Sequence, residues 1–87
     1  MPVVHIPAPM RELTGGLAEA TVEGSTVGEV VDALDRQFPG IKQRLCRGDS
    51  LVPGLQVCIN DVMTKRGLRA SLQPDSEVHF LPPISGG

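Results

Sequence analysis

Aromatic residues are almost missing from this chain of 87 residues, which contains two phenylalanines, no tyrosine and no tryptophan. Proteins that bind single-stranded nucleic acid stack its bases on aromatic side chains, and this sequence cannot build such a platform. Basic runs are missing as well, because eight lysines and arginines are interspersed among ten acidic residues, for a net charge of −2. We therefore expect no nucleic-acid partner.

Long apolar runs are also absent. No stretch approaches the roughly 20 apolar residues of a membrane-spanning helix. The segment from Met1 to Ala8 lacks the basic and apolar regions of a secretion signal. We expect a cytoplasmic protein with no membrane partner.

Cysteine is scarce, with Cys46 and Cys58 as the two thiols. They do not form a CxxC motif and no histidine is near them in the sequence, which argues against a zinc site and against a disulfide scaffold. We interpret both as ordinary reduced thiols. The alternative is a redox or acyl-accepting role for Cys46, which we expect to be exposed.

The apolar pattern predicts one long amphipathic helix and several short strands. Thr26 and Glu29 form the capping-box pattern of a helix start, and the apolar positions that follow recur at helical spacing up to Phe38. Pro39-Gly40 then ends the helix. The other predicted elements are strands at 3–6, 17–22, 56–59, 62–63 and 77–81, a helical turn at 41–46, a surface loop at 47–54, and an edge strand or turn at 68–72.

Two strands, one long helix and further short strands fit an α+β domain in which one sheet covers one helix. With the first and last strands side by side in the centre, this is the β-grasp (ubiquitin-like) arrangement, a mixed sheet of four to five strands packed on one main helix. The length of the chain allows a single domain. We assign residues 1–81 to this domain and 82–87 to a flexible C-terminal tail that ends in Gly86-Gly87.

The diglycine end carries the chemistry. Without Cβ atoms, Gly86 and Gly87 can pass through a narrow channel and place the terminal carboxylate against a nucleotide. Attack of that carboxylate on the α-phosphate of ATP would give an acyl adenylate, and sulfide or a persulfide could then displace AMP to leave a thiocarboxylate on Gly87. The chain has no phosphate-binding loop, so a partner must bind the ATP. Frayed terminal residues are the alternative interpretation.

This sequence resembles the MoaD/ThiS family, the small sulfur carriers of molybdopterin and thiamine biosynthesis, and also the CysO-like carriers of a cysteine synthase. The end from Phe80 to Gly87 looks closest to the molybdopterin synthase small subunit, whereas the loop from Arg47 to Gln56 is similar to CysO-like carriers. The resemblance rests on residues 11–15, 25–27, 57–61 and 75–87.

The resemblance implies a sulfur carrier that is not itself an enzyme and binds no cofactor. We expect its sulfur to serve molybdenum cofactor biosynthesis, with cysteine or thiamine biosynthesis as the alternatives. Its partners would be an E1-like adenylyltransferase, which uses the ATP, and a sulfur-accepting enzyme, either the molybdopterin synthase large subunit or a cysteine synthase. Gly87 would bear the sulfur, with Gly86 beside it. The partner-binding residues that the resemblance implies are Pro7, Met63, Leu81, Pro82, Pro83 and Ile84.

Several alternatives stay open. Met63 and Leu81 could complete the core instead of binding a partner. His5 and His79 lie on predicted neighbouring strands and could approach each other, but we expect no metal site there. The chain could also be a ubiquitin-like modifier joined to lysines through Gly87, or a passive binding module whose terminus is never activated.

Overall fold

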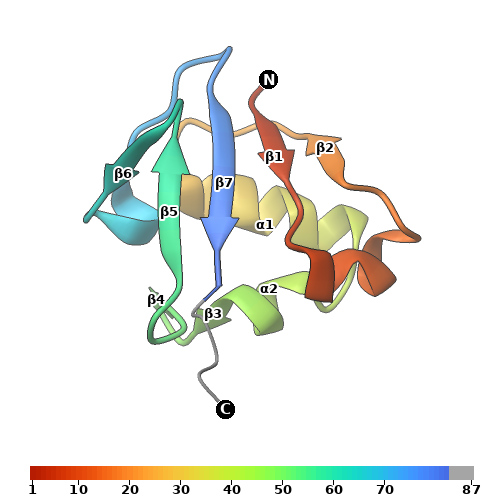
Figure 1. The fold of residues 1–87 in the computed structure, drawn as a ribbon. Helices are drawn as coiled ribbons and strands as arrows, with labels where there is room; N and C mark the ends of the chain where they lie inside the picture. Colours follow the sequence, from red (N-terminus) through yellow and green to blue (C-terminus); the bar gives the residue numbers. More distant parts are fainter. Residues whose placement is uncertain (83–87) are drawn as a thin grey trace.

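Five strands form one mixed sheet in the order β2-β1-β7-β5-β6 (Figure 1). The computed structural model describes residues 1–82 of the chain. The strands of this sheet are β1 (Val3–His5), β2 (Glu19–Thr21), β5 (Gln56–Ile59), β6 (Val62–Thr64) and β7 (Glu77–Leu81). Each of them falls within or beside a predicted strand, so the predicted mixed sheet is confirmed.

The first and last strands lie side by side in the centre of the sheet, as predicted. They pair in parallel, with Val4 opposite Val78 and His5 opposite His79. The other pairs of the sheet are antiparallel. Because side chains alternate along a strand, the fully buried Val4 and Val78 face the core, and the two histidines face the opposite side of the sheet.

The main helix, α1 (Val27–Gln37), covers the core side of the sheet (Figure 1). Its predicted capping box is confirmed: the Glu29 backbone N–H donates to Thr26 Oγ1 at 3.2 Å, and the Ser25 N–H donates to Glu29 Oε1 at 2.7 Å. The apolar stripe of the helix is buried against the sheet and consists of Val27, Val30, Val31 and Leu34.

Several short elements differ from the prediction. A 3-10 helix, η1 (Ala8–Thr14), occupies a connection predicted to be irregular, because Pro9 near its start supplies a helical φ and lacks an N–H that would need a partner. The predicted loop at 47–54 contains part of a small hairpin, β3 (Cys46–Arg47) with β4 (Ser50–Leu51). The segment at 68–72 overlaps a second 3-10 helix, η2 (Gly67–Arg69).

The remaining short elements follow the prediction. The predicted helical turn is α2 (Ile41–Leu45). Asn60 and Asp61 connect β5 to β6 with φ of 51° and 69°, the positive values that a two-residue hairpin turn requires. No helix within residues 1–82 is both long and apolar enough to cross a membrane.

Candidate functional site

The chain end leaves the domain from the middle of the sheet. Strand β7 lies between β1 and β5 and ends at Leu81, and the exposed Pro82 follows it. Strand β7 pairs with β1 as far as His79 and with β5 as far as Leu81, so both neighbouring strands fix its position in the sheet. The predicted roles of Pro83, Ile84, Gly86 and Gly87 fall on residues outside the described part of the chain.

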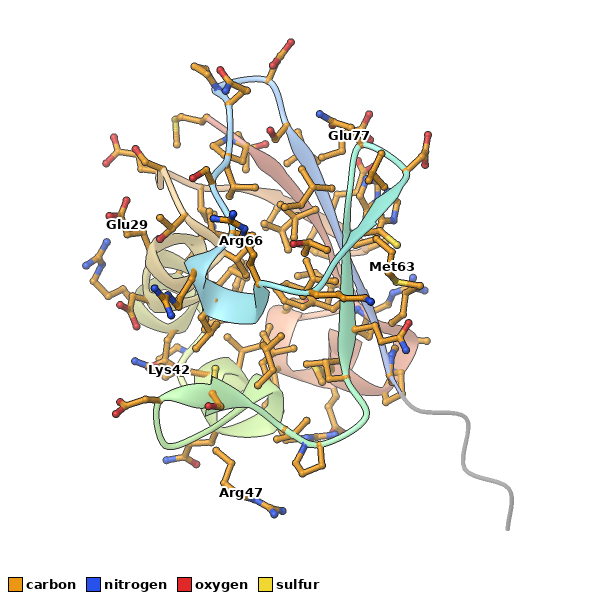
Figure 2. All side chains as sticks on the ribbon, turned by 90° about the vertical axis from the view of Figure 1, so that its left-hand side faces the viewer. Glu29, Lys42, Arg47, Met63, Arg66 and Glu77 are labelled. Atoms are coloured by element: carbon orange, nitrogen blue, oxygen red, sulfur yellow. The ribbon has the colours of Figure 1, made fainter. Side chains whose placement is uncertain are left out.

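Met63 and Leu81 lie on the outer face of the sheet, the side away from α1. Met63 pairs with Cys58, Cys58 pairs with His79, and Leu81 follows His79 by two positions. Figure 2 shows Met63 on the side of the sheet opposite the main helix. Met63 is 53% exposed and Leu81 is 40% exposed, so neither residue completes the core.

Pro7, the third residue that the resemblance assigned to partner binding, is buried. It precedes η1, and its carbonyl oxygen accepts the Met10 N–H at 2.9 Å. The expectation that its side chain belongs to an exposed contact surface is therefore not supported. The chain turns into the 3-10 helix at this point, and that turn draws the proline into the domain.

A row of polar and sulfur-containing side chains crosses the outer face from β2 to β6. The cross-strand pairs place it in the order Glu19, His5, His79, Cys58 and Met63. The rings of His5 and His79 stack with their centroids 3.9 Å apart and their planes 5° apart, and the Cys58 and Met63 sulfurs are 3.6 Å apart. The predicted approach of the two histidines is confirmed.

Sequence reasoning missed the carboxylates around His5. Glu77 Oε1 is 3.0 Å from His5 Nε2, and Glu19 Oε2 is 3.5 Å from His5 Nδ1. Glu77 precedes His79 by two positions, so strand alternation alone would have placed these two on one face. Glu19 could be placed beside His5 only from the β1–β2 register.

A basic group beside β6 was also missed. Lys65, Arg66 and Arg69 line a hollow of about 500 Å³ that runs from the end of β6 to η2. These three basic residues lie within a segment of five residues, although the protein as a whole is acidic, and this clustering could have identified them. They give this end of the sheet a positive charge.

Cys46 does not have the exposed position that an acyl-accepting or redox role would need. It is buried at the start of β3, with 9% of its surface exposed, and neither cysteine is in a disulfide. Burial raises the pKa of its thiol, and the Lys42 ammonium nearby lowers it by less. The reactive thiolate is therefore disfavoured at this position.

The profile of the ThiS family matches residues 4–87, which is nearly the whole sequence. The chain belongs to the ThiS family. The sulfur carrier protein CysO of Mycobacterium tuberculosis is 32% identical over 91 aligned residues, which cover 97% of this chain and 96% of that protein. The family resemblance inferred from the sequence is thereby confirmed. The CysO relatives are named as sulfur carrier proteins and not as enzymes.

Solved structures of similar proteins have the same fold. A chain from the crystal structure of the Amycolatopsis orientalis BexX/CysO complex superimposes with a TM-score of 0.93 at 31% identity, with complete coverage of both chains. The small archaeal modifier protein 1 of Methanosarcina acetivorans gives a TM-score of 0.81 at 28% identity, over 99% of this chain and 95% of that one. The β-grasp assignment is confirmed.

Proposed function

We propose that this ThiS-family protein is a sulfur carrier whose Gly87 carboxylate is activated by an E1-like adenylyltransferase and converted to a thiocarboxylate. The observation that carries the proposal is the family match, which extends through the diglycine end of the chain. The 32% identity to proteins named as sulfur carriers supports it.

The proposed chemistry needs little from the domain itself. The carboxylate of Gly87 attacks the α-phosphate of ATP bound to the partner, pyrophosphate leaves, and the acyl adenylate forms. A sulfide sulfur then attacks the acyl carbon, AMP leaves with the C–O electron pair, and the thiocarboxylate remains on Gly87. If the donor is a persulfide, the product is an acyl disulfide, and a thiol of the donor system must then attack the donor's sulfur, which forms a new disulfide and releases the thiocarboxylate. The carrier contributes a terminus without Cβ atoms that fits the partner's channel.

The outer face of the sheet is the surface we propose for docking the activating partner. Met63 and Leu81 are exposed apolar residues there. Methionine adapts its shape to an apolar partner surface. Leu81 and the exposed Pro82 place this surface next to the point at which the chain leaves the sheet, so docking would bring the terminus toward the partner's nucleotide.

Intact mass spectrometry tests the carrier proposal. The protein is co-expressed with the E1-like enzyme and a sulfur donor, and we expect a mass increase equal to the replacement of one oxygen by sulfur, located at Gly87 by fragmentation. Gly87→Ala should abolish the increase, because its methyl group crowds the activating channel. Gln43→Ala, on the exposed side of α2, is the matched control and should load like the wild type.

The channel argument and the carrier role can each be contradicted by a different outcome. Complete loading of Gly87→Ala would show that the channel argument is wrong while leaving the carrier role intact. A wild-type protein that never gains sulfur under these conditions would overturn the carrier role itself.

For the sulfur acceptor, we propose an enzyme of the cysteine synthase type. The similarity to CysO proteins supports this choice. The molybdopterin synthase large subunit is supported by the resemblance of the chain end, from Phe80 to Gly87, to the small subunit of that enzyme. When the acceptor enzyme and its amino-acid substrate are added, the carrier that bears the thiocarboxylate should gain one cysteinyl residue at its terminus. A precursor of the molybdenum cofactor that gains sulfur instead would favour the molybdopterin pathway.

A ubiquitin-like modifier is the second candidate function. The small archaeal modifier protein 3 of Haloferax volcanii is 28% identical over 67 residues, which cover 75% of this chain and 73% of that protein. A modifier would share the adenylated Gly87 but pass its acyl group to a lysine amine. Heavier conjugates in lysates of its own host, lost in Gly87→Ala, would support this function.

A further inference from the structure

We propose that the outer face of the sheet binds a divalent transition-metal ion, with Zn²⁺ as the expected ion, between β1 and β7. The ligands are His5, His79 and Glu77. Each offers one ligand atom, and these three atoms all lie within 4.8 Å of one another. Two imidazoles and a carboxylate are a known protein ligand set for zinc, with water in the remaining position.

The distance between His5 and Glu77 is suited to a shared ion. Two ligand atoms at about 2.0–2.2 Å from a tetrahedral Zn²⁺ lie roughly 3.3–3.6 Å apart. His5 Nε2 and Glu77 Oε1 are 3.0 Å apart, so a shift of a few tenths of an ångström would place both on one ion. Their strands, β1 and β7, are hydrogen-bonded neighbours in the sheet, which holds the two backbones at a constant separation.

A second carboxylate lies close to His5. Glu19 Oε2 lies 3.5 Å from His5 Nδ1, on the opposite side of the ring from Glu77. A carboxylate that holds one ring nitrogen as N–H leaves the other nitrogen as the electron-pair donor, which is the usual outer-shell arrangement of metal-binding histidines. Without the ion, Glu77 is the closer carboxylate, at 3.0 Å from Nε2; once Glu77 and Nε2 both bind the ion, Glu19 is the carboxylate left to accept the Nδ1–H.

His79 supplies the third ligand from the strand that also carries Glu77. In the stacked arrangement its ring lies parallel to that of His5, so binding requires rotation of His79 about its side-chain torsions. The outer face leaves room for this rotation, since His79 is only partly buried and Glu77 is 57% exposed at its side chain. The next residue in the row, Cys58, places a sulfur atom beyond His79 and outside the three-ligand cluster.

A zinc titration of the untagged, full-length protein tests the site. The chain has two histidines, so a ¹H–¹⁵N spectrum of the imidazole nitrogens contains signals from His5 and His79 alone. We expect one equivalent of Zn²⁺ to shift the Nε2 resonance of His5 and one nitrogen of His79, with isothermal titration calorimetry giving a stoichiometry of one. Imidazole signals that stay unchanged at saturating Zn²⁺ would overturn the proposal without any variant.

Variants then assign the ligands. His5→Ala and His79→Ala should each weaken Zn²⁺ binding by more than about 100-fold, and Glu19→Gln by about 10- to 100-fold, as is typical of outer-shell partners. Cys58→Ser is the matched control and should bind as the wild type does. Thermal melts without zinc confirm that each variant is folded. Loss of binding in Cys58→Ser, with unchanged binding in the histidine variants, would place the ion on the thiol and contradict the proposed site.

Discussion

At the scale of single residues, the two cysteines differ in a way that sequence could not show. Cys58 lies in a short apolar segment and Cys46 lies between Leu45 and Arg47, and Cys46 was expected to be the exposed one. The structure buries Cys46 and leaves Cys58 partly exposed on the outer face of the sheet. The difference arises because Cys46 joins α2 to β3 beneath the main helix, a placement that depends on the packing of both elements.

This difference predicts the order of thiol alkylation. Iodoacetamide at neutral pH should modify Cys58 first, because burial both blocks access to Cys46 and raises the pKa of its thiol. Peptide mapping by mass spectrometry after a time course measures the two rates. In denaturant, where neither thiol is buried, the rates should become similar.

Raising the pH adds a second expectation for Cys46. Its folded-state pKa is raised above the unfolded value, so its contribution to folding stability is fully present below the unfolded pKa and is lost as the pH rises through the folded pKa.

Alkylation of Cys46 that is as fast as that of Cys58 in the native protein at neutral pH would contradict the buried position.

At the scale of elements, the start of α1 was predictable because its signals are local. The Thr26 hydroxyl satisfies the Glu29 N–H, and the Glu29 carboxylate satisfies the Ser25 N–H. Thr26→Ala should therefore lower the free energy of unfolding by about 0.5–2 kcal/mol. Thr26→Ser keeps the accepting oxygen and is the matched control. Urea unfolding followed by circular dichroism measures both variants, and equal stability of the two would show that the cap contributes nothing.

The shortest elements were the ones that sequence patterns missed. Strands β3 and β4 have two residues each, too few to show an alternation of apolar and polar positions. Their pairing exists because Val52 N–H donates to the Leu45 carbonyl and closes the hairpin against α2. Helix η1 was missed for a different reason: its prolines are compatible with either an irregular exit or a first helical turn.

At the scale of the whole molecule, the fold and the proposed activity should separate. Within residues 1–82, the hydrophobic core cluster runs from Val4 to Phe80, so we expect the fold not to depend on the diglycine end. Deletion of Gly86 and Gly87 should leave the melting temperature unchanged and abolish sulfur loading. Leu34→Ala, at a fully buried position of α1, should instead cost about 2–5 kcal/mol of unfolding free energy.

Calorimetry and the loading assay, run on the same two variants, make this comparison. A large loss of stability on deletion would show that the terminus is part of the core. Sulfur loading that survives the deletion would show that the sulfur is not carried on Gly87.

The helix cap, the last strand and the diglycine end could be deduced from the sequence alone. Each depends on residues within a few positions of one another, where backbone hydrogen bonding and apolar spacing have direct consequences. The family resemblance rests on the same local segments. These features were sufficient to predict the β-grasp fold and a carrier role for Gly87.

Only the tertiary structure decided what surrounds the two histidines and which residues remain exposed. His5 is 72 positions from Glu77 in the sequence, and the parallel register of β1 with β7 brings them to 3.0 Å. A shift of that register by one residue would turn every side chain of β1 to the other face. Strand pairing over such separations is set by packing of the whole core, which explains why the burial of Pro7 and Cys46 and the proposed metal site could not be deduced from local sequence.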